Sequence, residues 1–361
     1  MRILLLSDVN SVHTRKWAVS LKEAGIDLAI FSLAEPEGGW YQDHSIPLFL
    51  AKPHSPVRRC KPFYLFQYLS VKAAIDAFQP ELIHAHYASS YGLLGALSGF
   101  HPFILSVWGS DVFDFPGISF LHRKVLEFNL SKADKVLSTS KIMAKETAKY
   151  INREIEVIPF GTDINLFKPQ PVDSLFHKDD IVIGAIKALE PIYGLSYLIK
   201  AFKRVKENNP QLQLKLLLVG SGHEEKMLKQ LVNDLSIQND VVFTGKIEYS
   251  DVPRYHNMIS IYVALSTQES FGVSIIEAQA TGKPVVVSNI GGLPEVVVDG
   301  LTGIVVEPKN PEEAARALES LIHDNHLRET MGKNGRERIV ETYNWNDNLN
   351  QMITIYRGMI K

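Results

Sequence analysis

Two glutamates flank a glycine-led turn in the second half of the chain. Glu269 and Glu277 stand eight positions apart, with Gly272 between them at the predicted start of a helix. The free amides of Phe271, Gly272 and Val273, together with the positive end of that helix, favour phosphate oxygens. Glu277 can accept two hydrogen bonds from a ribose diol. The segment therefore predicts a site for a ribose, a diphosphate and a sugar.

The same segment resembles the signature of the family 4 retaining glycosyltransferases. That signature runs Glu-x-Phe-Gly-x-x-x-x-Glu, followed by Gly-x-Pro-Val and Gly-Gly-x-x-Glu. Any single glutamate would equally be a solvated helix charge or a cap, but so many typed positions in one short window argue against coincidence. The resemblance implies that Glu269 contacts the donor sugar's hydroxyls and that Glu277 contacts the ribose. The matching positions are Glu269, Phe271, Gly272, Glu277, Gly282, Pro284, Val285, Gly291, Gly292 and Glu295.

A departing diphosphate needs positive charge or oriented amides around it, and basic side chains can supply this in place of a metal. Family members carry an arginine and, five positions later, a lysine after the first strand of the second domain. Here Lys187 stands at the arginine position and Ile192 at the lysine position. The resemblance implies a catalytic contact between Lys187 and the diphosphate, and donor binding weakened by Ile192. Arg15 or Lys246 is the expected compensation.

Gly245 and Lys246 follow the apolar run VVFT and, by the resemblance, lie beside the base of the nucleotide. No feature of the sequence separates UDP from GDP or ADP, and a UDP sugar is the donor that we expect. We predict neither a cofactor nor a metal site. The chain has no Asp-x-Asp motif, and its single cysteine and scattered histidines lack the spacing of a zinc site.

The first half of the chain offers candidates for the acceptor side. Asp111 can hydrogen-bond sugar hydroxyls and support positive charge at the anomeric carbon, or alternatively cap the helix that follows. Trp108 stands where family members often carry a sugar-contacting histidine. His86, at the end of the run ELIHAH, and His13 and Arg15, in the first loop, are expected to contact the acceptor. Such a histidine more commonly has a structural role, in which its imidazole is hydrogen-bonded to backbone groups.

Short apolar runs alternate with amphipathic stretches along the chain, a pattern typical of parallel α/β sheets. The length of 361 residues suggests two domains, at about 100 to 200 residues each. We expect an α/β fold with two Rossmann-like doubly wound domains facing across a cleft, the GT-B architecture that the resemblance also implies. The acceptor-side domain covers 1–165 and the nucleotide-sugar domain 166–345, with a helix at 346–361 packing back onto the first.

The composition is that of an ordinary globular chain, with 45% hydrophobic residues and a net charge of -2 that gives no general attraction to nucleic acid. The apolar opening is too short for a signal peptide, no run reaches a membrane span, and Cys60 is alone, so a cytoplasmic location is expected. Residues 52–69 place basic before aromatic side chains. This segment either contacts the inner face of an anionic membrane or forms a solvated loop and a core helix.

These observations support one hypothesis and two alternatives. The chain is expected to be a retaining, metal-independent glycosyltransferase that moves a sugar from a nucleotide-diphosphate sugar to a glycan, glycolipid or lipid-linked acceptor in surface polysaccharide or glycoconjugate synthesis. In the front-face mechanism expected for this group, the departing phosphate itself deprotonates the acceptor. The alternatives are a GT-B nucleotide-sugar epimerase and a non-catalytic sugar-nucleotide-binding protein, the latter motivated by Ile192 and Trp108.

Overall fold

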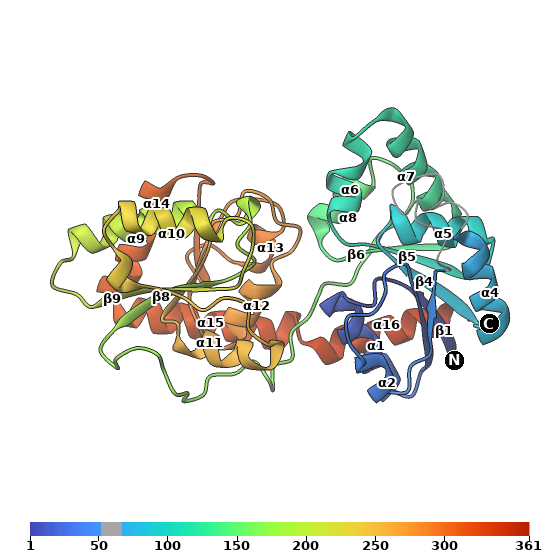
Figure 1. Cartoon of the computed structure of the whole chain (residues 1–361), viewed down its shortest axis with the longest axis horizontal. Helices are drawn as coiled ribbons and strands as arrows, with labels where there is room; N and C mark the ends of the chain where they lie inside the picture. Colours follow the sequence, from blue (N-terminus) through green and yellow to red (C-terminus); the bar gives the residue numbers. More distant parts are fainter. Residues whose placement is uncertain (52–66, 361) are drawn as a thin grey trace. The chain divides into compact units, whose positions relative to one another are not determined.

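A computed structural model of the chain describes residues 1–51 and 67–360 (Figure 1). The chain divides into two compact units, Met1–Pro159 with Asp347–Lys361, and Phe160–Asn346. The domain boundary expected at residues 165 and 166 therefore falls inside the second unit. Most of the segment 52–69, including Cys60, lies outside the described residues.

The first unit is built on a sheet of seven strands in the described part of the chain, and every pairing is parallel. The order β3-β2-β1-β4-β5-β6-β7 reverses its direction of winding between β1 and β4. The apolar runs of β4 and β5 are buried along their whole length, as expected for parallel strands covered on both faces. The strands are β1 (Arg2–Leu6), β2 (Asp27–Ser32), β3 (Leu48–Leu50), β4 (Leu82–His86), β5 (Phe103–Val107), β6 (Lys135–Ser138) and β7 (Glu156–Val157).

Helices follow these strands, and all of those described except α2 have residues buried in the unit. In α1 the buried residues Thr14, Trp17, Ala18 and Leu21 recur at helical spacing, which explains why this stretch folds as an amphipathic helix. The helices of this unit are α1 (Val12–Glu23), α2 (Trp40–Asp43), α4 (Tyr68–Phe78), α5 (Ser90–Ser98), α6 (Ser110–Phe113), the 3₁₀ helix η1 (Phe115–Gly117), α7 (Phe120–Lys132) and α8 (Lys141–Thr147).

The last helix of the chain, α16 (Trp345–Met359), lies with the sheet of the first unit from Asp347 onward (Figure 1). Its Tyr356 is fully buried, and the hydroxyl shares a hydrogen bond of 2.7 Å with Nδ1 of His84 in β4. Nε2 of His84 pairs with Oγ of Ser106 in β5, also at 2.7 Å. A buried polar chain thus ties the C-terminal helix to two central strands.

The second unit has a parallel sheet of six strands among its described residues, in the order β10-β9-β8-β11-β12-β13. Here the winding reverses between β8 and β11. Ligands of open α/β sheets bind beyond the carboxyl ends of the strands at such a switch point, so the residues after β8 and β11 are the candidates for a ligand site. The strands are β8 (Ile181–Ile186), β9 (Leu214–Val219), β10 (Val241–Phe243), β11 (Ile261–Ala264), β12 (Val285–Ser288) and β13 (Gly303–Val306).

Helix α12 is unusual in this unit because it is buried nearly all round. Every residue from Ser274 to Ala280 is buried, and α15 covers the helix, with Gly335 against the side chain of Gln279. The unit also contains α9 (Leu195–Asn208), α10 (Glu225–Asp234), α11 (Val252–Met258), α12 (Val273–Ala280), α13 (Leu293–Val296), α14 (Pro311–His323), α15 (Asn325–Thr342), and the 3₁₀ helices η2 (Pro191–Tyr193), η3 (Gln238–Asp240) and η4 (Tyr249–Asp251). No helix in the described part of the chain is both long and apolar enough to span a bilayer.

The buried His84 makes the stability of the first unit depend on pH. Burial lowers the pKa of His84 to about 3, whereas an unfolded histidine titrates near its ordinary value of 6.5. Below that value the unfolded chain takes up a proton that the folded chain refuses, so stability should fall by up to about 1.4 kcal/mol per pH unit as the pH drops. Thermal unfolding at about pH 7 and about pH 5 measures this loss.

The variant His84→Gln removes the titrating group, so its loss of stability between the two pH values should be smaller than that of the wild type. His323→Gln, at an exposed position, is the control and should behave as the wild type does. Equal pH dependence in the wild type and in His84→Gln would contradict the assignment.

Candidate active site

An ion pair joins the two loops at the switch point of the second sheet. Lys187 is the first residue after β8, and Glu269 lies in the loop between β11 and α12. The Lys187 Nζ and Glu269 Oε2 atoms are 2.6 Å apart, and their side chains are only 12% and 11% exposed. Burial opposes the charged lysine, but the nearby Glu269 carboxylate outweighs it and raises the pKa of Lys187. Two of the predicted catalytic residues thus form one charged unit.

Tyr193 completes the surroundings of this pair. The Lys187 Nζ lies 4.6 Å from the centroid of the Tyr193 ring, within the range of a cation–π contact. Tyr193 belongs to η2, as does Ile192, whose carbonyl accepts a hydrogen bond of 2.7 Å from the Thr267 amide. The Ile192 side chain is half-exposed. The loop after β8 is therefore bonded directly to the loop after β11, at the position where the family lysine is missing.

Glycines hold the backbones of the paired residues in place. A Cβ added to Gly291, at φ +53°, would lie 1.8 Å from the carbonyl oxygen of Glu269, and the amide of Gly292 donates to that oxygen at 3.1 Å. A Cβ on Gly220 would lie 2.0 Å from the carbonyl oxygen of Lys187. Close backbone approach on either side of the ion pair thus explains the Gly291-Gly292 pair and Gly220, in the turn after β9.

The start of α12 has the arrangement expected of an anion site. Gly272 adopts φ +104° at the N-cap, and no side chain caps the helix. Amides of a first helical turn have no partner within the helix, so those at Val273 and the next residue suit phosphate oxygens. The Phe271 side chain is buried, with its ring centroid 5.7 Å from that of Tyr343. Its side chain is therefore part of the core, and only its backbone is available for a donor.

Glu277 is buried in α12 and lies against two residues that the sequence did not indicate. The Tyr249 hydroxyl donates to Oε1 of Glu277 at 3.2 Å, and Nε2 of His256 lies 3.7 Å from Oε2. Burial lowers the pKa of His256, and both of its ring nitrogens are buried without a hydrogen-bond partner. A diol reaching Glu277 would meet a carboxylate already oriented by Tyr249.

Gly245 and Lys246 lie beyond the end of β10. The carbonyl of Gly245 accepts a hydrogen bond from the Gly220 amide at 3.0 Å, which joins the turns after β10 and β9. Gly245 has φ +73°, with open space where a Cβ would stand, and Lys246 is exposed. Both predicted base-side residues therefore lie on the same carboxyl edge of the sheet as Lys187.

In the first unit, three predicted residues form an aromatic cluster at the carboxyl edge. His86 stacks on Trp108 with ring centroids 4.5 Å apart and planes 29° apart, and His13 meets Trp108 edge-on at 5.9 Å. Nδ1 of His86 pairs with Oγ of Ser7 at 3.1 Å. Burial, and then the neighbouring histidines, hold the pKa of His86 well below 6.5, so this imidazole is neutral. Arg15 is exposed, with its guanidinium carbon 5.9 Å from the Trp40 ring centroid.

Asp111 has a structural environment rather than a sugar-facing one. Its side chain is fully buried, and its oxygens accept hydrogen bonds from the amides of Ala88 at 2.6 Å and Gly109 at 2.7 Å, with Trp108 at 3.2 Å. Burial raises the pKa of Asp111 against the effect of these bonds. The carboxylate therefore organises the loop that carries Trp108, and it does not cap α6 as the sequence suggested.

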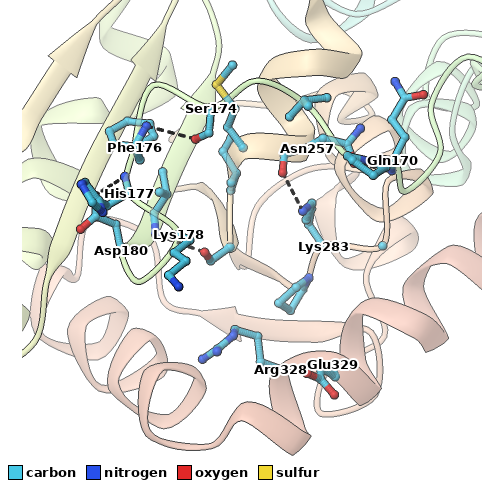
Figure 2. Close-up of a pocket in the computed structure, with 18 of the residues that line it drawn as sticks. Gln170, Ser174, Phe176, His177, Lys178, Asp180, Asn257, Lys283, Arg328 and Glu329 are labelled. Atoms are coloured by element: carbon cyan, nitrogen blue, oxygen red, sulfur yellow. Dashed lines mark hydrogen bonds between the residues drawn. The ribbon is translucent and has the colours of Figure 1, made fainter.

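A cavity of about 410 Å³ lies at the opposite, amino ends of β8, β11 and β12 (Figure 2). Lys178, Lys283 and Arg328 line it, and none of the predicted site residues does. The Lys283 ammonium donates to the carbonyl of Asn257 at 3.1 Å, and burial lowers its pKa to about 8. This cavity is on the wrong edge of the sheet for the donor site. Within residues 1–51 and 67–360, no group of three or more His, Cys, Asp or Glu side chains is arranged to hold a metal ion.

Family models match both units. The model of the glycosyl transferases group 1 matches residues 167–338, and that of the glycosyl transferase 4-like proteins matches residues 2–140. The chain belongs to the group 1 glycosyltransferases. The resemblance predicted from the Glu269 to Glu295 segment is thereby confirmed.

Relatives of this group 1 glycosyltransferase have low sequence identity to it but align with most of its length. An uncharacterised glycosyltransferase of Methanocaldococcus jannaschii is 28% identical, over 79% of this chain and 78% of its own length. The N-acetyl-alpha-D-glucosaminyl L-malate synthase of Bacillus anthracis is 26% identical, over 78% of this chain and 75% of its own. The solved structure of Anabaena HepE in complex with UDP has a TM-score of 0.83 at 22% identity, and covers 99% of this chain and 100% of that one. The predicted α/β fold of the GT-B class is confirmed.

The close approach at Gly291 makes the glycosyltransferase sensitive to a single methyl group. We expect Gly291→Ala to push the Glu269 loop away and lower turnover by roughly a hundredfold, because small displacements of positioning groups cost that much. Gly300→Ala is the matched control, since Gly300 has φ +72° but open space around a Cβ. Both variants carry left-handed strain of about 1–2 kcal/mol, so both melt earlier, but only Gly291→Ala should lose turnover. Equal loss in the control would contradict the argument.

Proposed function

We propose that this glycosyltransferase retains the anomeric configuration and uses a nucleotide-diphosphate sugar as its donor. The donor that we propose is a UDP sugar. The Lys187–Glu269 ion pair beside the uncapped start of α12 is the observation that carries this proposal. It puts a cation, a carboxylate and free helix amides at one switch point, which are the groups that a sugar joined to a diphosphate requires. The complexes of Anabaena HepE with UDP and with UDP-glucose support this choice of donor.

In the proposed reaction, the bond between the anomeric carbon and the phosphate oxygen breaks as the acceptor oxygen bonds to the same face of the sugar. The acceptor proton passes to the departing phosphate. Lys187 and the amides of α12 stabilise the charge that grows on the diphosphate, while Glu269 holds the sugar hydroxyls. Asp111 is engaged by backbone amides and Glu269 by Lys187, so neither is assigned as a nucleophile. This arrangement favours the front-face mechanism and requires no metal.

We assign the acceptor side to the aromatic cluster of the first unit. Trp108 and His13 are partly exposed and present ring faces and edges that suit the apolar face of a sugar, and the buried His86 supports the Trp108 ring by stacking on it. Arg15 is the exposed cation nearest to them in sequence. The acceptor class that we propose is a glycan, a glycolipid or a lipid-linked sugar, in surface polysaccharide or glycoconjugate synthesis. Cytoplasmic location remains part of this proposal.

A panel of UDP, GDP and ADP sugars tests the donor. A bound nucleotide raises the melting temperature by mass action, and product analysis with simple glycans identifies the linkage. We expect UDP to stabilise the wild type, and Glu269→Gln to keep that stabilisation while slowing turnover by roughly a hundredfold or more. Glu312→Gln, which removes an exposed partner of Arg204, is the control and should turn over normally.

Full turnover in Glu269→Gln would contradict the assignment of Glu269. Consumption of the nucleotide sugar without any acceptor, with exchange of ring protons in deuterated water, would instead identify an epimerase. Nucleotide binding without any product would identify a non-catalytic binding protein.

Glu277 is expected to act on binding rather than on chemistry. Two hydrogen bonds to a carboxylate are worth about 1.5–3 kcal/mol each, so Glu277→Ala should raise the KM for the donor at least tenfold while kcat changes little. Tyr249→Phe keeps the carboxylate and loses only its orienting hydroxyl, so its KM should rise less. Steady-state kinetics with varied donor separate the two parameters. A fall in kcat at unchanged KM would contradict the ribose assignment.

A further inference from the structure

The three most exposed large hydrophobic side chains of the described residues stand within four positions of one another. Ile118 is 64% exposed, Phe120 76% and Leu121 69%. They precede and begin α7 of the first unit. Single exposed hydrophobic residues are common, but a contiguous group of this size marks a surface that contacts a membrane or another molecule.

The exposure of these residues follows from how α7 is anchored. Ser119 caps the helix by accepting a hydrogen bond from the His122 amide at 3.4 Å. The buried face of α7 consists of Leu126, Asn129 and Leu130, which contribute to the core. Since Phe120 and Leu121 point away from that face at helical spacing, burying them in the unit would require the helix to turn over.

The outward face of α7 alternates aromatic rings with cations. Phe120, Lys124, Phe128 and Lys132 follow one another at intervals of four, which places them along one side of the helix. The Lys124 ammonium lies 5.4 Å from the Phe120 ring centroid, and the Lys132 ammonium lies 5.6 Å from that of Phe128. A solvent-facing helix side normally carries only polar residues, so this stripe is not explained by solubility.

The charge of this segment is opposite to that of the whole chain. Residues 118–132 contain three basic residues, Arg123, Lys124 and Lys132, and one acidic residue, Glu127, in a chain of net charge -2. Glu127 pairs with Arg123 at 3.0 Å and with Lys124 at 2.6 Å. A net positive stripe with protruding hydrophobic side chains is complementary to an anionic lipid surface, where rings enter the interface and ammonium groups meet phosphates.

We propose that residues 118–132 dock the first unit on the surface of an anionic bilayer, with Ile118, Phe120 and Leu121 inserted at the interface. The docking segment follows directly in sequence from Trp108 through α6 and η1, and the His122 ring packs against Phe115 of η1 at 4.9 Å. Docking at a membrane would give the enzyme access to acceptors that are presented there. This statement about the acceptor rests on the proposed function. The docking segment is different from residues 52–69.

Sedimentation of the full chain with lipid vesicles tests the docking directly and needs no turnover. We expect binding to phosphatidylcholine vesicles that contain about one third phosphatidylglycerol, weaker binding to phosphatidylcholine alone, and release by salt. Phe120→Ser/Leu121→Ser should lower the bound fraction by about tenfold or more. Lys124→Gln/Lys132→Gln should remove the preference for the anionic vesicles.

Matched controls distinguish docking through this segment from non-specific binding to vesicles. Leu175→Ser removes a half-exposed leucine elsewhere, and Lys229→Gln removes a lysine that lies 5.6 Å from the Phe243 ring, so both should bind as the wild type does. Absence of vesicle binding by the wild type, or unchanged binding by Phe120→Ser/Leu121→Ser, would overturn the proposal. A concentration-dependent dimer that this variant abolishes would overturn it as well, by assigning the surface to a second copy of the chain.

Failure of the docking proposal can be distinguished from failure of the proposed function. Melting temperature with UDP reports the donor site of the second unit, so a docking variant that loses vesicle binding should keep its response to UDP. Loss of both in the same variant would show damage to the whole protein and would overturn the docking assignment. Melting temperatures without nucleotide confirm that each variant is folded.

Discussion

The ion pair between Lys187 and Glu269 is the contact on which the site of the second unit depends. Its partners are 82 positions apart in sequence and meet only because β8 and β11 are neighbours in the sheet. A buried ion pair is a weak source of stability, but removal of one partner leaves an uncompensated charge. The glycines at 220 and 291 exist because the backbones carrying this pair approach other chain segments too closely for a Cβ.

The two units offer opposite electrostatic environments. The second unit concentrates charge, because the largely buried side chains of Lys187, Glu269 and Glu277 lie at one edge of its sheet. The first unit has the Trp108 indole stacked on the neutral imidazole of His86 at the carboxyl edge of its own sheet, because burial suppresses the protonation of His86. A charged diphosphate and an uncharged sugar acceptor call for these two environments. The contrast therefore supports the proposed division between donor and acceptor.

The sequence revealed what depends on residue type at fixed spacing and missed what depends on packing. Glu269, Gly272 and Glu277 were found because their types recur at set intervals beside an apolar run. Tyr249 and His256 were not found, because their contact with Glu277 depends on how η4 and α11 pack against α12. Asp111 was expected either to contact a sugar or to cap a helix, and its actual partners could not be foreseen, because backbone amides leave no trace in the identity of neighbouring residues.

The burial of Tyr356 against His84 has a consequence for how the chain is made. The first unit takes its final helix from the far end of the sequence, so Met1–Pro159 leaves the ribosome with the site for α16 still open. Phe160–Asn346 is contiguous and is translated in full before the residues of the last helix of the first unit. Translation therefore finishes the second unit before the first. The surface around His84 that Tyr356 covers stays exposed during that interval, when an incompletely folded chain is prone to association.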